Sequence, residues 1–512
     1  MNSELTGRIN CPPNRHLGLT LWCATGVFFF LLYLGTAQRG VSWQDSGIFQ
    51  WRVLNGDYSG DMGLALAHPL YIAAGRVLAL FPQRHLPFLL NAFSGLGMAV
   101  ALANLAALGT FLTGRRWIAL LTAAMLGVCH TVWWLSTIAE TYTWSVAGLT
   151  AELYLLAVLI RRPRWTVLTG LMLVNGLGLC LHNLALLPLP VYCCVAVVLV
   201  VRRRIPAWSL AAAAGTYLLG AGMFLVMIAQ LIAQNHDVLG AIRSALVGNY
   251  GGEVMNVGGA SKNWQANTVL AGMNFLNLLL PLGVLGWVRF RRRLGTGLAA
   301  ALGAVALIEL VFFVRYPIPD QFTFILPTLV MIATAAAVGL DELRRWRRRW
   351  RGVAVTLCLL SLIAQPVFFA TAPRLARNFT QKVRKRQLPF RDELRYWLVP
   401  WKHNEQSASL FAAAALGEVE PNAVILPDST SLYPLLLVQR LDGLRGDVSL
   451  QHGSHPFPNY KRRPEAFLAA ASSRPFYVVS DAPGYLPPLL LTKAALERRN
   501  GAVLYQVHWK SP

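Results

Sequence analysis

Charged residues are scarce in this chain. Only 13% of its 512 residues are Asp, Glu, Lys or Arg, whereas 55% are hydrophobic. An ordinary soluble domain carries about 25% charged residues. The composition therefore excludes a water-soluble enzyme and predicts a polytopic α-helical membrane protein.

Long apolar runs recur along the first 372 residues. A run of about 20 residues crosses roughly 30 Å of hydrocarbon, and eleven such spans are expected, at residues 17–36, 86–112, 117–135, 142–160, 165–182, 184–201, 207–234, 266–288, 294–314, 321–340 and 352–372. The first lacks a small-x-small cleavage site before Gln38, so it is expected to remain as a signal anchor. The apolar segment 63–81 contains His68, Pro69 and Arg76 and is expected to be a helix that lies on the outer membrane surface or dips into the membrane.

Acidic residues are half as frequent as basic ones, 23 against 46, and the net charge is +23. Nucleic acid is not needed to explain this excess, because basic residues collect on the cytoplasmic side of membrane proteins. Here they cluster in alternate loops, at residues 115–116, 161–164, 202–204, 289–293 and 344–351. We therefore expect a multi-pass membrane protein, with its amino terminus, including Arg8 and Arg15, in the cytoplasm and its carboxyl-terminal region outside.

Cysteine is also rare. All seven cysteines occur at or before Cys358, and no C-x-x-C spacing is present. The carboxyl-terminal region therefore has no disulfide framework, and no metal site or cofactor is expected. A divalent cation held by an acidic pair is the alternative.

The composition changes after residue 372, where long apolar runs end. We expect a transmembrane domain over residues 1–372, with its first outer loop at 37–85, an interfacial linker at 373–403 and a small α/β domain at 404–512. Strands are expected at 422–427, 447–451, 475–480 and 502–509, and helices at 405–417, 431–441 and 463–472. The linker is rich in charged and aromatic residues, which favours a position on lipid headgroups. Binding of an anionic lipid substrate is its alternative role.

Six ionisable residues are expected at the outer ends of the spans: Asp45, His68, Glu140, His182, Arg315 and Asp320. A solvated helix cap or a helix-end hydrogen bond explains each of them singly. Their occurrence on one side of the membrane is more informative, because ionisable groups near hydrocarbon are costly and tend to mark function.

Several short motifs carry a resemblance to a known family. They are DSGIF from Asp45, AHPLY from Ala67, LFP from Leu80, VWWLSTIAETYTW from Val132, GLCLHNLALLPLP from Gly178, PNAVILPDSTSLYPLLLVQ from Pro421 and GLRGDV from Gly443. Together they resemble bacterial protein O-mannosyltransferase-like membrane proteins, a family that includes an animal mannosyltransferase of plexin-type receptors. The resemblance extends over nearly the whole chain. It implies a GT-C glycosyltransferase of the bacterial inner membrane with many spans, a catalytic Asp in the first outer loop and a sugar donor carried on polyprenyl phosphate.

The chain departs from that family at two points. Ile48 stands where the family usually has Glu, and the family's HPPG-x-PLY is contracted to the sequence from His68 to Tyr71. A second carboxylate would then come from Asp57, Asp61 or Glu140.

Glycosyl transfer to a hydroxyl needs a base, and a partly desolvated carboxylate serves well. Asp45 is the expected base of an inverting transfer. A leaving lipid phosphate needs positive charge, and an arginine fork fits phosphate oxygens. Arg315 is therefore expected to bind the donor phosphate, assisted by His68 or His182, while Glu140 and Asp320 complete the donor and acceptor site.

The predicted function is transfer of a mannose-like sugar from a polyprenyl-phosphate donor to a hydroxyl on a protein, glycan or lipid, outside the cytoplasm. Two alternatives remain. A transporter or flippase is suggested by Glu152 within a span, and a structural assembly factor would use the outer domain to bind partners.

Overall fold

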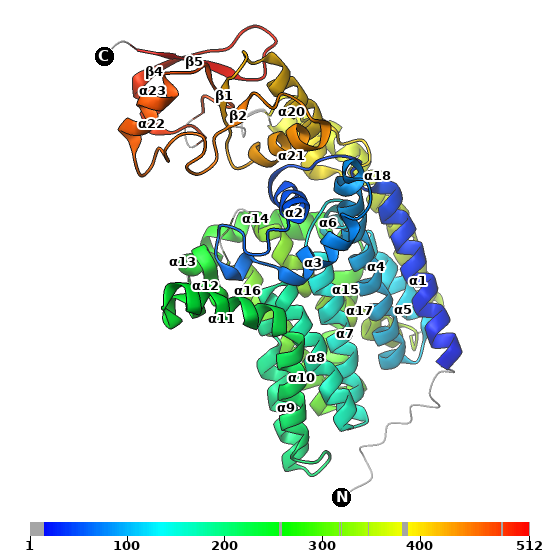
Figure 1. The fold of residues 1–512 in the computed structure, drawn as a ribbon. Helices are drawn as coiled ribbons and strands as arrows, with labels where there is room; N and C mark the ends of the chain where they lie inside the picture. The colour runs from blue at the N-terminus through cyan, green and yellow to red at the C-terminus, as the bar shows by residue number, and fades with distance from the viewer. Residues whose placement is uncertain are drawn as a thin grey trace, which may run out of the picture.

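The chain folds into a helical bundle with a sheet-containing region at one end (Figure 1). This computed structural model describes residues 15–510 except 255, 257, 258, 317, 319, 347, 381–387, 483 and 484. The expected cytoplasmic Arg8 and part of the expected linker lie outside the described residues.

Eleven helices of the described residues form the main bundle. They are α1 (Arg15–Thr36), α4 (Leu86–Thr113), α5 (Arg116–Gly127), α7 (Tyr142–Arg161), α8 (Trp165–Leu181), α9 (Leu189–Val201), α10 (Ser209–Gly220), α15 (Leu279–Leu294), α16 (Thr296–Arg315), α17 (Ile325–Leu343) and α18 (Arg348–Thr380). Within the described residues, seven helices are long and apolar enough to cross a membrane, or nine if each of two bent pairs counts as one span. The chain is an integral membrane protein.

Four of the expected spans differ from straight membrane-crossing helices. The span expected at 207–234 bends by 70° between α10 and α11 (Gly222–Asn235), and the one at 266–288 bends by 96° between α14 (Gly259–Asn274) and α15. The helices α5 and α8 have only 12 and 17 residues. The run at 117–135 breaks before α6 (His130–Leu135), where Cys129 has extended backbone angles. Apolar runs alone do not reveal the two bends, because the two helices of each bent pair are together apolar enough to pass as one span.

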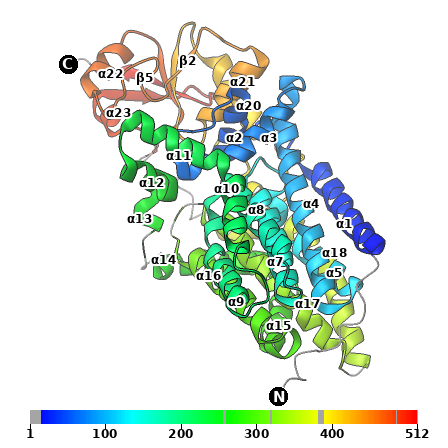
Figure 2. The ribbon, with the colours of Figure 1, turned by 60° about the horizontal axis from the view of Figure 1, so that its bottom comes forward.

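A layer of short helices lies between the bundle and the sheet-containing region, as Figures 1 and 2 show. It contains α2 (Gln44–Asn55), α3 (Pro69–Leu78) and α6, with α12 (Val238–Val247) and α13 (Gly251–Val254) to one side. The segment 63–81, which was expected to lie outside the spans, contains the helix α3. The buried face of α3 includes Tyr71 and Ile72 and packs against α2, α4 and α8.

The carboxyl-terminal region contains a five-stranded sheet of order β2-β1-β3-β5-β4. The strands β1 (Val424–Leu426), β2 (Ser449–Leu450) and β3 (Phe476–Val478) are parallel, and β5 (Tyr505–Trp509) is antiparallel to both β3 and β4 (Ala494–Glu497). Its helices are α20 (Ser407–Glu418), α21 (Leu432–Asp442), α22 (Pro464–Ala471) and α23 (Pro488–Lys493), preceded by α19 (Glu393–Leu398). The four expected strands and three expected helices are present, whereas β4 and α23 were not predicted. This architecture confirms the predicted helical membrane protein with a small carboxyl-terminal α/β region.

Candidate active site

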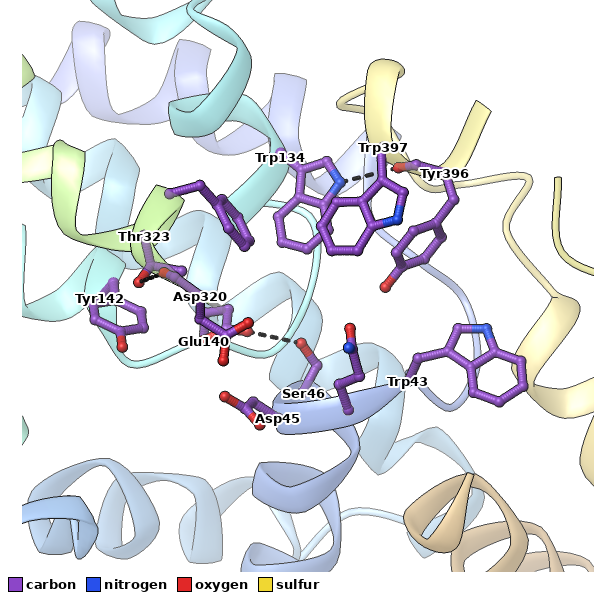
Figure 3. A pocket seen from close by; sticks show the side chains of 12 residues that line it. Trp43, Asp45, Ser46, Trp134, Glu140, Tyr142, Asp320, Thr323, Tyr396 and Trp397 are labelled. Carbon is purple, nitrogen blue, oxygen red and sulfur yellow. Dashed lines mark hydrogen bonds between the residues drawn. The ribbon is translucent and has the colours of Figure 1, made fainter. Parts of the chain in front are cut away.

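Three carboxyl groups from distant parts of the chain line one pocket (Figure 3). Asp45 lies in the first turn of α2, Glu140 lies between α6 and α7, and Asp320 directly precedes the short 3-10 helix η5 (Gln321–Phe324). The connections that carry Glu140 and Asp320 therefore meet the first outer loop, which carries Asp45. The sequence analysis grouped these three polar residues on one side of the bundle.

The start of α2 is fixed by the carboxyl-terminal region, and this positions Asp45. The buried Trp43 indole donates through Nε1 to Ser407 Oγ at 2.8 Å, and its ring lies 5.4 Å from that of Phe411. The Gln44 backbone N–H donates to the Thr430 carbonyl at 3.4 Å. Asp45 is thus held at the pocket by the contacts of the two residues that precede it, Trp43 and Gln44.

Glu140 is buried, and both its backbone and its carboxyl group form hydrogen bonds. Its backbone N–H donates to Ser94 Oγ on α4 at 2.8 Å, while Ser46 Oγ on α2 donates to Glu140 Oε1 at 3.1 Å. Glu140 therefore ties the α6–α7 connection to the helix that carries Asp45.

Burial and neighbouring carboxyl groups raise the proton affinity of Asp45 and of Glu140. Burial, followed by the charge and hydrogen bond of Asp320, raises the pKa of Asp45 to about 7. Burial, followed by the charge of Asp45, raises the pKa of Glu140 well above its ordinary value. Asp45 keeps solvent-exposed surface toward the pocket although protein surrounds it on most sides. A carboxylate in this setting is a stronger base than a solvated one.

A row of rings leads away from the pocket. The ring of Tyr142, which lines the pocket, lies 4.9 Å from His182, and His182 lies 5.1 Å from His68. The His68 ring nitrogen Nδ1 is 2.7 Å from the Leu181 carbonyl. Burial, followed by the charge of His182, lowers the pKa of His68 well below its ordinary value. His68 is therefore a neutral, buried ring behind the pocket and not part of its lining.

Arg315 is not among the residues that line the pocket. Its Nη1 donates to the carbonyls of Val254 at 2.6 Å and Asn256 at 3.2 Å.

One wall of the pocket was missed by the sequence analysis. It consists of aromatic side chains, namely Trp43, Trp134, Phe322, Tyr396 and Trp397. The Trp134 and Trp397 rings are stacked at 5.6 Å with an interplanar angle of 10°, and Trp134 Nε1 donates to the Tyr396 carbonyl at 3.2 Å. Tyr396 and Trp397 belong to the expected interfacial linker, where an aromatic pair is typical of a lipid surface, so their sequence gave no indication of the pocket.

The other acids considered for the site lie away from it. Asp57 accepts hydrogen bonds from the backbone of Ser59 and Gly60, and the largely exposed Asp61 is 3.5 Å from His452. Within the described part of the chain, no group of three His, Cys, Asp or Glu side chains is arranged to hold a metal ion.

No protein-family model and no curated protein sequence matches the chain. Solved structures do match. ArnT from Cupriavidus metallidurans bound to undecaprenyl phosphate superposes with a TM-score of 0.55 at 12% identity, covering 96% of this chain and 97% of ArnT. The apo state of the same protein gives 0.53 at 14% identity, with 96% and 98% covered. The likeness shows a shared GT-C fold over nearly the full length of both chains.

Proposed function

We propose that the chain is a membrane glycosyltransferase that moves a sugar from a polyprenyl-phosphate donor to an acceptor hydroxyl on the extracytoplasmic side. The observation that carries this proposal is the convergence of Asp45, Glu140 and Asp320 at one end of an apolar bundle. The fold supports it, because ArnT, which shares that fold, has been crystallised with undecaprenyl phosphate. A mannose-like sugar and an acceptor on protein, glycan or lipid follow from the motif resemblance.

The proposed transfer is a single inverting displacement. Asp45 takes the proton of the acceptor hydroxyl, whose oxygen forms the new bond to the anomeric carbon. The bond from that carbon to the phosphate oxygen breaks, and the lipid phosphate leaves with the electron pair. Burial and the neighbouring Asp320 favour this step because they hold the Asp45 proton affinity high.

Arg315 is proposed to bind the donor phosphate from the side of Tyr250 and Tyr316. Its Nη1 is bonded to backbone carbonyls, so the phosphate would be met by the other N–H groups of the guanidinium. The aromatic wall around Trp397 and Trp134 offers ring faces on which a sugar can stack.

The proposal is tested with purified protein in liposomes and radiolabelled polyprenyl-phosphate sugars. Asp45→Asn keeps the size of the side chain but cannot accept a proton, so transfer should fall about 100-fold or more while donor binding persists. Asp61→Asn is the matched control, because Asp61 is exposed and outside the pocket. Near-normal turnover in Asp45→Asn would contradict the proposal, and movement of labelled lipid across the bilayer without product would favour a transporter.

A further inference from the structure

A buried arginine contacts the aromatic wall of the pocket. Arg391 lies two residues before α19, and its side chain is only 7% exposed. Its guanidinium carbon is 4.5 Å from the centre of the Tyr396 ring and 5.5 Å from the centre of the Trp43 ring. Both rings line the pocket, whereas Arg391 is not among the lining residues. Arg391 can therefore act on the pocket through these two rings.

The two rings come from distant parts of the chain. Trp43 directly precedes α2, the helix that carries Asp45, and Tyr396 belongs to α19. A guanidinium over an aromatic ring is attracted by the negative charge of the ring face, and the attraction is stronger where water is excluded. Arg391 therefore joins α2 to the segment that follows the last span.

Glu393 connects Arg391 to a third ring of the wall. Arg391 Nε donates to Glu393 Oε1 at 2.6 Å, and Trp397 Nε1 donates to Glu393 Oε2 at 3.2 Å. Trp397 is the ring that stacks on Trp134. Within the described residues, the buried Arg391 Nη1 has no hydrogen-bond partner. The ion pair and the two ring contacts thus account for the position of the guanidinium.

We infer that Arg391 and Glu393 are positioning residues that hold the aromatic wall in the arrangement that contacts the sugar of the donor. The inference rests on the proposed function. It assigns to the wall, and not to the acids, the discrimination between a lipid phosphate that carries a sugar and one that does not. Lysine cannot replace Arg391 in this role, because an ammonium group has neither a planar face nor a fork of donors.

The test compares two ligands, a radiolabelled polyprenyl-phosphate sugar and polyprenyl phosphate without sugar, on the purified full chain in lipid. Arg391→Lys should weaken binding of the sugar-bearing lipid about 5- to 30-fold, the range of a desolvated cation–π contact, and should raise KM by a similar factor. Affinity for the lipid without sugar and kcat at saturating donor should stay near wild type, because Asp45 is unchanged.

Glu393→Gln is a second variant, which decides the matter if Arg391→Lys does not fold. It keeps an acceptor for Trp397 Nε1 but loses the charge that holds Arg391, so it should show the same selective loss to a smaller extent. Arg395→Lys is the matched control, because Arg395 is an exposed residue of the same helix and should bind both lipids as wild type does.

Two results would overturn the inference: equal loss of affinity for both lipids, which a merely structural role predicts, or unchanged affinity for the sugar-bearing lipid. These outcomes differ from a failure of the proposed function. If wild-type protein consumes no polyprenyl-phosphate sugar, the transferase proposal itself fails. If wild type transfers sugar and the variants show no selective loss, only the role of Arg391 and Glu393 is refuted.

Discussion

At the scale of single residues, the chemistry of the pocket depends on how tightly Asp45 binds a proton. Its charged form is disfavoured by burial and by the neighbouring Asp320 carboxyl. The same neighbours would be unfavourable in a purely structural cap, because a cap is most effective when its carboxylate is fully ionised. The cluster is thus better suited to proton transfer than to fixing the end of α2.

Asp320→Asn should shift the pH dependence of transfer toward lower pH. The substitution removes a like charge, so the charged form of Asp45 becomes less costly and its pKa falls below the value of about 7. Because the base acts when it is deprotonated, the rising limb of kcat/KM against pH moves with that pKa. The profile is measured with wild type and variant in the same lipid. An unchanged midpoint would show that Asp320 does not tune the base.

The sequence predicted the members of the acidic pocket better than the groups around them. Asp45, Glu140 and Asp320 could be selected because ionisable residues at the ends of apolar runs are unusual. The separation of Arg315 from the pocket could not be foreseen, because it results from the backbone path at Val254 and Asn256. The aromatic wall was missed for a different reason: tryptophan beside charge has the same pattern at a lipid surface and in a pocket.

At the scale of elements, α2 is packed so closely on the segment that precedes it and on α21 that one position allows only glycine. A Cβ added to Gly47 would lie 2.5 Å from the Ser42 carbonyl oxygen and 3.0 Å from Tyr433 Cβ. This close approach explains the glycine of the DSGIF motif by packing. It also means that the orientation of Asp45 depends on the carboxyl-terminal region.

Gly47→Ala should therefore destabilise the protein by about 1–3 kcal/mol, the usual cost of overpacking, and lower transfer activity by displacing α2. Thermal unfolding in detergent and turnover in liposomes provide the two measurements. Gly417→Ala is the control, because this exposed position in α20 has nothing within 4 Å of an added Cβ and should keep or slightly raise Tm. Equal stability of Gly47→Ala and wild type would contradict the packing argument.

At the scale of the whole molecule, the acidic pocket lies where several connections of the bundle meet. The connections at Glu140, His182 and Asp320 all contact residues of the first outer loop. Two of the basic clusters meet near the end of α17, where Arg293 and Arg344 pair with Asp341. The side of the membrane that each basic cluster faces stays a prediction from the alternation of basic loops, and the bends at α11 and α14 were not visible in that alternation.

This arrangement predicts which parts of the chain are accessible from outside the cell. Ser454 is exposed and lies two residues from His452, which contacts Asp61 of the first outer loop, whereas Arg115 is exposed between α4 and α5. In intact cells, a membrane-impermeant thiol reagent should label Ser454→Cys, and it should reach Arg115→Cys only after the membrane is permeabilised. The parent protein controls for the native cysteines. The opposite pattern would put the Asp45 pocket in the cytoplasm, where the proposed extracytoplasmic transfer could not take place.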